Sequence, residues 1–116
     1  MWLFTPFGFF SIVQKPGDAP QGTLTVRARV REDLESLRLR YLPCLGEIRE
    51  SGSHDYRFRA QAPRSEVSAA MSALVDDLAY SNFKNQVSKE QGPARAHLYH
   101  DVWSVLYQLQ ESRHAD

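Results

Sequence analysis

The chain has 116 residues, of which 42% are hydrophobic and 24% are charged. This composition is ordinary for a globular domain and excludes a wholly disordered chain. The 14 Lys and Arg residues balance the 14 Asp and Glu residues, so no net charge draws the protein toward nucleic acid or an anionic membrane. Cys44 is the single cysteine, which excludes an internal disulfide and makes a cytoplasmic location the default expectation.

The opening segment MWLFTPFGFFSIV is apolar enough to raise the question of a signal peptide. It lacks a basic region at its start and is interrupted by Pro6 and Gly8, so we interpret it as the beginning of the fold. No stretch of the chain approaches the roughly 20 apolar residues that a membrane span needs. We therefore expect no membrane association.

The first predicted elements are two strands joined by a loop. Residues 8 to 14 (GFFSIVQ) are rich in aromatic and β-branched residues, as strands are. The segment 15 to 22 is rich in Pro and Gly, and we expect it to be the most mobile loop. Residues 23 to 30 (TLTVRARV) alternate between polar and apolar, which predicts a strand with Arg27 and Arg29 on the face opposite the core.

A helix and a second hairpin follow. Apolar residues recur at helical spacing from 31 to 42, with acidic residues in the first turn. Residues 46 to 51 and 55 to 62 flank the turn SGSH and predict a pair of strands. Strict alternation in the second strand places Tyr56 and Phe58 on the core side. The opposite face then carries Arg57, Arg59 and Gln61.

The remaining residues favour helices. The stripe of apolar residues from 65 to 78 predicts one helix, and residues 81 to 90 predict a short or bent one. After the break at QGP, a last helix is expected over 94 to 110, with Leu98, Val102, Val105 and Leu109 on one side. We expect residues 111 to 116 to be frayed.

The element order β-β-α-β-β-α-α predicts an α+β protein, a single domain over residues 1 to 116 with one antiparallel four-stranded sheet. This order is that of a ferredoxin-like fold whose last strand has moved to the front. Short hairpins and a right-handed crossover predict the spatial strand order 1-2-4-3, with residues 23 to 30 and 55 to 62 in the two central strands.

The arginines of the two central strands then share one sheet face, where like charges on neighbouring strands repel. Either Phe9 or Phe10 must face the same side. Three interpretations remain open. Internal acids such as Glu47 neutralise the charge, a protein partner or a second copy of the chain covers the face, or the face binds an anionic ligand. The candidate binding residues are Arg27, Arg29, Arg57, Arg59, Phe9 and Phe10.

Nucleic acid is one anionic ligand to consider, because RNA-recognition modules combine aromatics and basic residues on a sheet. The zero net charge and the absence of an RNP-type run argue against it. A surplus helix, left over once two helices cover the sheet, favours the protein partner. We therefore expect an interaction module without catalytic activity, self-associating as a homodimer or binding another protein.

Motifs for catalysis or metal binding are absent from the sequence. There is no phosphate loop, CxxC or HExxH, so we expect no cofactor and no metal. An enzymatic or small-molecule site stays an alternative at two places. One is the arginine face, and the other is a small polar pocket at the bend between helices, formed by Tyr80, Asn82 and Lys84.

Five segments together resemble a family of small bacterial proteins without an assigned activity. They are FFSIVQ, LTVRAR, DYRFRA, YSNFK and VWSVLY, spaced between residues 9 and 107. The resemblance implies a bacterial, cytoplasmic protein of one domain. It implies no catalytic or binding residues.

Overall fold

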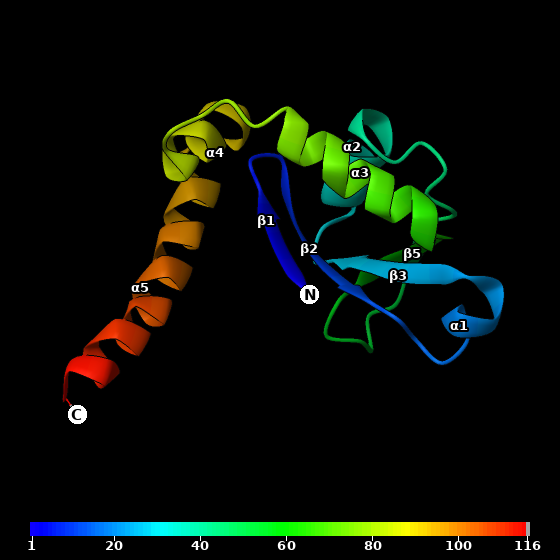
Figure 1. The fold of residues 1–116 in the computed structure, drawn as a ribbon, viewed down its shortest axis with the longest axis horizontal. Coiled ribbons are helices and arrows are strands. Elements are labelled where there is room, and N and C mark those ends of the chain that lie inside the picture. Colours follow the sequence, from blue (N-terminus) through cyan, green and yellow to red (C-terminus); the bar gives the residue numbers. More distant parts are fainter. Residues whose placement is uncertain (116) are drawn as a thin grey trace. The chain divides into compact units, whose positions relative to one another are not determined.

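The computed structural model describes residues 1 to 115, with side chains described for residues 1 to 111. The chain forms two compact units, Met1–Ala79 and Tyr80–Asp116. The first unit contains the sheet and the helices α1 to α3, and the second contains α4 and α5 (Figure 1). The single domain expected from the sequence stays a prediction.

The sheet has five antiparallel strands in the spatial order β1-β2-β3-β5-β4. The α+β class is confirmed, and so is the neighbour order of the four strands expected from the sequence. The strand count of four is wrong because the opening segment forms an additional strand. The strands are β1 (Trp2–Thr5), β2 (Gly8–Val13), β3 (Thr23–Ala28), β4 (Arg49–Glu50) and β5 (Phe58–Pro63).

The additional strand β1 pairs with β2 through a tight turn at Pro6 and Phe7. The Thr5 hydroxyl closes this turn, because it accepts a hydrogen bond from the Gly8 N–H at 3.0 Å and donates one to the Gly8 carbonyl at 2.8 Å. A strand of four residues that begins at the chain terminus is too short for its alternation to be recognised in the sequence.

Two helices cover one face of the sheet, α2 (Arg31–Arg40) and α3 (Arg64–Asp76), as Figure 1 shows. The predicted spans of both helices are close to those observed. Alternate residues of the strands meet these helices in the core, where Phe10, Val26 and Ala60 are fully buried. Leu34 and Leu37 of α2 and Val67 and Ala70 of α3 complete the core.

The loop between β2 and β3 differs from the mobile segment that we expect. It contains a short helix, α1 (Asp18–Gln21), and the side chain of Asp18 is fully buried. The Asp18 carboxylate accepts hydrogen bonds from the hydroxyls of Thr23 and Thr25, from the side-chain amide of Gln61 and from the Lys15 N–H. Three of these four bonds tie the loop to the strands, two of them to β3 and one to β5, where Gln61 lies 43 residues away in the sequence.

The second unit is a hairpin of two helices, α4 (Phe83–Gln91) and α5 (Pro93–Ala115). Gly92 joins them with a φ of 98°, which only glycine adopts readily. Val87 is fully buried between the helices, and the ring of Phe83 stacks on Tyr99. Helix α5 continues past its expected end near residue 110, and Asp116 lies outside the described residues. Among the described helices, none has the length and apolar character needed to cross a membrane.

Candidate functional site on the outer face of the sheet

The face of the sheet opposite α2 and α3, here called the outer face, carries the arginines of the two central strands. Strand register sets Arg27 of β3 directly opposite Arg59 of β5, and Arg59 opposite Arg49 of β4. Paired residues on antiparallel strands point to the same face. These three residues, here called the arginine row, therefore lie side by side with about 5 Å between neighbouring strands.

The arginine row lacks internal neutralisation. Arg27 donates to the Ser11 hydroxyl at 2.7 Å, and Arg59 makes a long bond of 3.5 Å to the Tyr56 carbonyl. Neither residue forms an ion pair with a carboxylate of the described chain, and the Nε atom of each is buried without a hydrogen-bond partner. A buried donor left unpaired costs about 1–3 kcal/mol. The centre of the outer face thus holds partly desolvated guanidinium groups that form no ion pair within the described residues.

An aromatic cluster, the aromatic platform, adjoins the arginine row. It consists of Trp2, Phe4, Phe9 and Tyr56. The Phe9 ring is its centre, with Phe4 stacked at 4.5 Å, Trp2 edge-on at 5.8 Å and Tyr56 at 6.4 Å between ring centroids. The structure decides the open alternative in strand β2, because Phe9 faces outward, whereas Phe10 is fully buried in the core. The side chain of Trp2 is 66% exposed.

Tyr56 is not on the core side, as strict alternation predicts. Strand β5 begins only at Phe58, and the residues before it form a bend, so the alternation does not extend back to Tyr56. The Tyr56 ring lies beneath two guanidinium groups on the outer side, Arg27 at 4.6 Å and Arg29 at 4.4 Å from its centroid. Tyr56 is 3% exposed and connects the platform to the row.

Arg29 and Arg57 lie outside the row. Arg29 follows β3, where its guanidinium donates to the Asp55 carbonyl at 2.6 Å. Arg57 precedes β5 and forms an exposed ion pair with Glu50 of β4, with 2.7 Å between nitrogen and oxygen. The residue opposite Arg27 is therefore Arg59, and Arg57, which the sequence places on the same face as Arg27, pairs with Glu50 instead.

Internal neutralisation thus applies to Arg57 and not to the row. Glu47, the acid that we expected beside the arginines, is exposed and precedes β4. Asp77 of the first unit accepts a hydrogen bond from the Tyr41 hydroxyl at 2.7 Å, and Asp101 of the second lies 3.9 Å from His97. Glu47, Asp77 and Asp101 thus form no ion pair with Arg27 or Arg59.

Asp18 places a buried carboxylate on the outer face, where hydrogen-bond donors saturate it. Burial acts to raise the pKa of Asp18, but the hydrogen bonds from Thr23, from the Lys15 N–H, and from Thr25 and Gln61 outweigh it and lower the pKa to about 2. Asp18 therefore stays ionised at neutral pH, and its role here is to hold the loop against the sheet.

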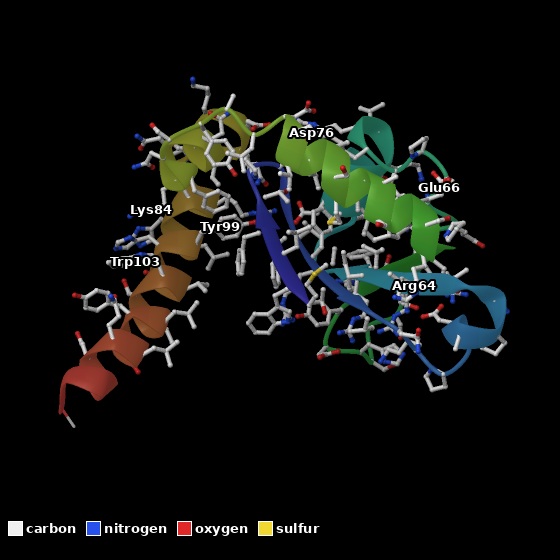
Figure 2. The ribbon with its side chains drawn as sticks, in the orientation of Figure 1. Arg64, Glu66, Asp76, Lys84, Tyr99 and Trp103 are labelled. Atoms are coloured by element: carbon white, nitrogen blue, oxygen red, sulfur yellow. The ribbon has the colours of Figure 1, made fainter. Side chains whose placement is uncertain are left out.

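The second predicted place, at Tyr80, Asn82 and Lys84, lies in the helical unit. Asn82 caps α4 by accepting a hydrogen bond from the Asn85 N–H at 2.9 Å. The Lys84 ammonium lies 2.9 Å from Nδ1 of His100 and over the ring of Trp103 (Figure 2). Tyr80 packs against Phe83. These contacts give Tyr80, Asn82 and Lys84 structural roles in the helix hairpin. In the described part of the chain, no group of three or more His, Cys, Asp or Glu is arranged to hold a metal ion.

Several residues of the outer face were not singled out by sequence reasoning. Arg49 was not named, although it lies in the strand predicted over residues 46 to 51, and Trp2 and Phe4 were missed because β1 was not recognised. Two features of the sequence could have indicated β1. One is its aromatic content, and the other is the pair Pro6 and Gly8 after it, which favours a turn. Asp18 offered no signal beyond its place in a turn, since Gln61, one of its partners, is 43 residues away.

Comparison of this chain with protein-family models, with curated proteins and with solved structures found no match.

Proposed function

We propose that this protein is a non-catalytic interaction module whose outer sheet face binds an acidic segment of a partner protein. The observation that carries the proposal is the arginine row, in which Arg27 and Arg59 have buried Nε atoms without partners and no internal carboxylate. A guanidinium recognises a carboxylate through two parallel hydrogen bonds, and this geometry suits Asp and Glu side chains of a partner.

The composition of the face supports a protein partner. Arginine and aromatic residues are the types enriched at the centres of protein interfaces, where they account for much of the binding energy. The row offers charge, and the adjoining platform offers apolar area at the half-buried Phe9 and the exposed Trp2. A partner with an acidic segment next to an apolar one would match both the arginine row and the aromatic platform.

Nucleic acid is the weaker alternative for the same face. Bases bind to sheet modules by stacking on free aromatic rings. Here the Phe4 ring is already stacked on Phe9, and the guanidinium groups of Arg27 and Arg29 already lie over the Tyr56 ring. The net charge of zero also provides no long-range attraction to a polyanion.

The test measures binding of a fluorescent polyglutamate peptide by anisotropy, in low salt and at about 0.15 M salt. We expect Arg49→Gln, an exposed change in the row, to weaken binding about tenfold, equivalent to about 1.4 kcal/mol. Arg57→Gln is the matched control, because Arg57 lies on the same hairpin but is neutralised by Glu50, and it should change binding less than about twofold.

Failure of polyglutamate to bind in low salt, or equal losses in the two variants, would contradict the proposal. A parallel titration with oligothymidylate addresses the nucleic-acid alternative. Tighter binding of oligothymidylate than of polyglutamate, lost in Arg49→Gln, would assign the face to nucleic acid instead.

The resemblance to small bacterial proteins and the free, exposed Cys44 favour a bacterial, cytoplasmic protein. The permuted ferredoxin-like description of strands β2 to β5 also stays a prediction.

A further inference from the structure

Helix α5 presents a line of apolar side chains that the helix hairpin does not cover. Leu98, Val102, Val105 and Leu109, here called the apolar seam, are separated by four, three and four positions, which places them along one side of a helix. Leu98 is 57% exposed, Val105 61% and Leu109 67%. Apolar residues are common on surfaces singly, but a continuous line of them marks an interaction site.

Helix α4 occupies a different side of α5. Its contacts are the stacking of Phe83 on Tyr99 and the approach of Lys84 to His100 and Trp103. Figure 2 shows Lys84, Tyr99 and Trp103 along this hairpin. The seam residues do not take part in these contacts. At 100° per residue, one flank of α5, its polar side, carries His97, Asp101, Ser104 and Gln108. Outside the seam, α5 also exposes Trp103, Leu106 and Tyr107. The seam is thus an apolar line bordered on one flank by polar residues, on the side of α5 that α4 leaves open.

We infer that the seam is covered by the seam of a second copy of this chain, with the two α5 helices antiparallel. The spacing four-three-four reads the same in both directions, and so does the residue pattern Leu-Val-Val-Leu. Antiparallel pairing about a twofold axis between residues 103 and 104 sets Leu98 against Leu109 of the second copy and Val102 against Val105. A twofold interface requires a surface that is complementary to itself, and the seam meets this requirement.

Electrostatics also favour a second copy of the chain as the partner that covers the seam. The four seam residues carry no charge, and the equal numbers of basic and acidic residues keep two copies from repelling each other. Antiparallel helices also place the positive end of each macrodipole beside the negative end of the other. Because four residues per helix bury far less than the roughly 1,200 Å² of a standard interface, we expect a dissociation constant in the micromolar range.

Sedimentation of the full chain between about 1 and about 100 µM tests the association. We expect a monomer–dimer equilibrium in which Val105→Glu raises the dissociation constant at least tenfold. Val105 is exposed in the single chain, so this variant should keep its helical circular dichroism. Ser104→Glu adds the same charge at the neighbouring position on the polar side and should leave the dissociation constant within about twofold. A monomer throughout the range, or equal effects of the two variants, would overturn the inference.

Cysteine cross-linking tests the orientation. In a Cys44→Ser background, chains with Leu98→Cys are mixed with chains with Leu109→Cys and oxidised. The antiparallel pair predicts disulfides between the two kinds of chain, because residue 98 of each copy lies about 16 Å along the axis from residue 98 of the other, beyond disulfide reach. Disulfides within each kind of chain, or none between the two kinds, would contradict the arrangement. These variants leave the arginine row intact, so the inference and the proposed function fail independently.

Discussion

At the scale of single residues, Asp18 shows how a buried charge is tolerated. Burial without partners would neutralise a carboxylate, because the charged form loses its hydration. Asp18 instead accepts hydrogen bonds from three side chains and one backbone N–H. Bonds to an ionised acceptor are about twice as strong as those between neutral groups. The charge is therefore part of what fastens the β2–β3 loop to the sheet.

Asp18→Asn keeps the shape of the side chain, removes its charge and replaces one acceptor by a donor. We expect the free energy of unfolding at pH 7 to fall by about 1–3 kcal/mol, because donors such as the Thr25 hydroxyl lose a charged acceptor. Urea denaturation measures the loss. Glu47→Gln, at an exposed acid, is the control and should change stability by less than about 0.5 kcal/mol.

Comparison of wild type with Asp18→Asn also isolates the part of the pH dependence of stability that is due to Asp18. The pKa of Asp18 is lowered from 3.8 to about 2 in the folded protein, so its charge contributes stability that is fully present above pH 3.8. This contribution is lost as the pH falls through the folded pKa. We expect the stability difference between wild type and Asp18→Asn to shrink between pH 4 and pH 2. A difference that stays constant over that range would show that the charge of Asp18 does not stabilise the fold.

At the scale of elements, the β1–β2 hairpin is held by close packing at Gly8. A Cβ atom at this position would lie 2.9 Å from the Cβ of Asp33 and 2.9 Å from the Cζ of Phe10. The Asp33 carboxylate also accepts a hydrogen bond from the Phe9 N–H at 3.0 Å, which joins the hairpin to helix α2. The absence of a side chain at residue 8 lets the hairpin approach α2 closely.

We therefore expect Gly8→Ala to destabilise the protein by about 1–3 kcal/mol through overpacking. Gly17→Ala is the matched control, because a Cβ there meets nothing within 4 Å and the φ of −80° suits alanine. Thermal denaturation of the two variants gives the comparison. Equal melting temperatures would mean that Phe10 and Asp33 shift at little cost and that the close approach is not required.

At the scale of the whole molecule, the two compact units differ in the core that each can build. The first unit buries residues from all its longer strands and from two helices. The described part of the second buries chiefly Val87 and Tyr99, and much of α5 is exposed. A two-helix unit with so small a core has little stability of its own.

Hydrogen exchange should reveal this difference. At protein concentrations well below the micromolar dissociation constant inferred for pairing of α5, we expect the amides of β3, the central strand, to exchange slowest. The amides of α5 beyond residue 100 should exchange fastest among regular elements. Mass spectrometry of proteolytic peptides gives the required resolution. Protection of α5 equal to that of β3 under these conditions would contradict the assignment of a weak helical unit.

The sequence by itself determined the local elements and their buried sides. The period of two in residues 23 to 30 predicted which face of β3 carries Arg27, because side chains alternate across a strand whatever its neighbours are. The helical spacing of Leu34 and Leu37 predicted α2 in the same way. Short hairpins and a single crossover allow only a few spatial orders of the strands in the sheet. The order predicted for the four recognised strands, β2 to β5, was correct.

Only the tertiary structure decided which residues meet on the outer face. Pairing Arg27 with Arg59 depends on the register of strands joined through a helix and a hairpin, and a local pattern does not specify that register. The bend before Phe58 turned Tyr56 outward, although alternation predicted the opposite. Asp18 and Gln61 come together only when β5 pairs with β3. Local periodicity determines which side chains of a strand point to each face of the sheet. Long-range strand pairing determines which side chains become neighbours on that face. The candidate site is made of such neighbours, so the sequence alone did not specify it.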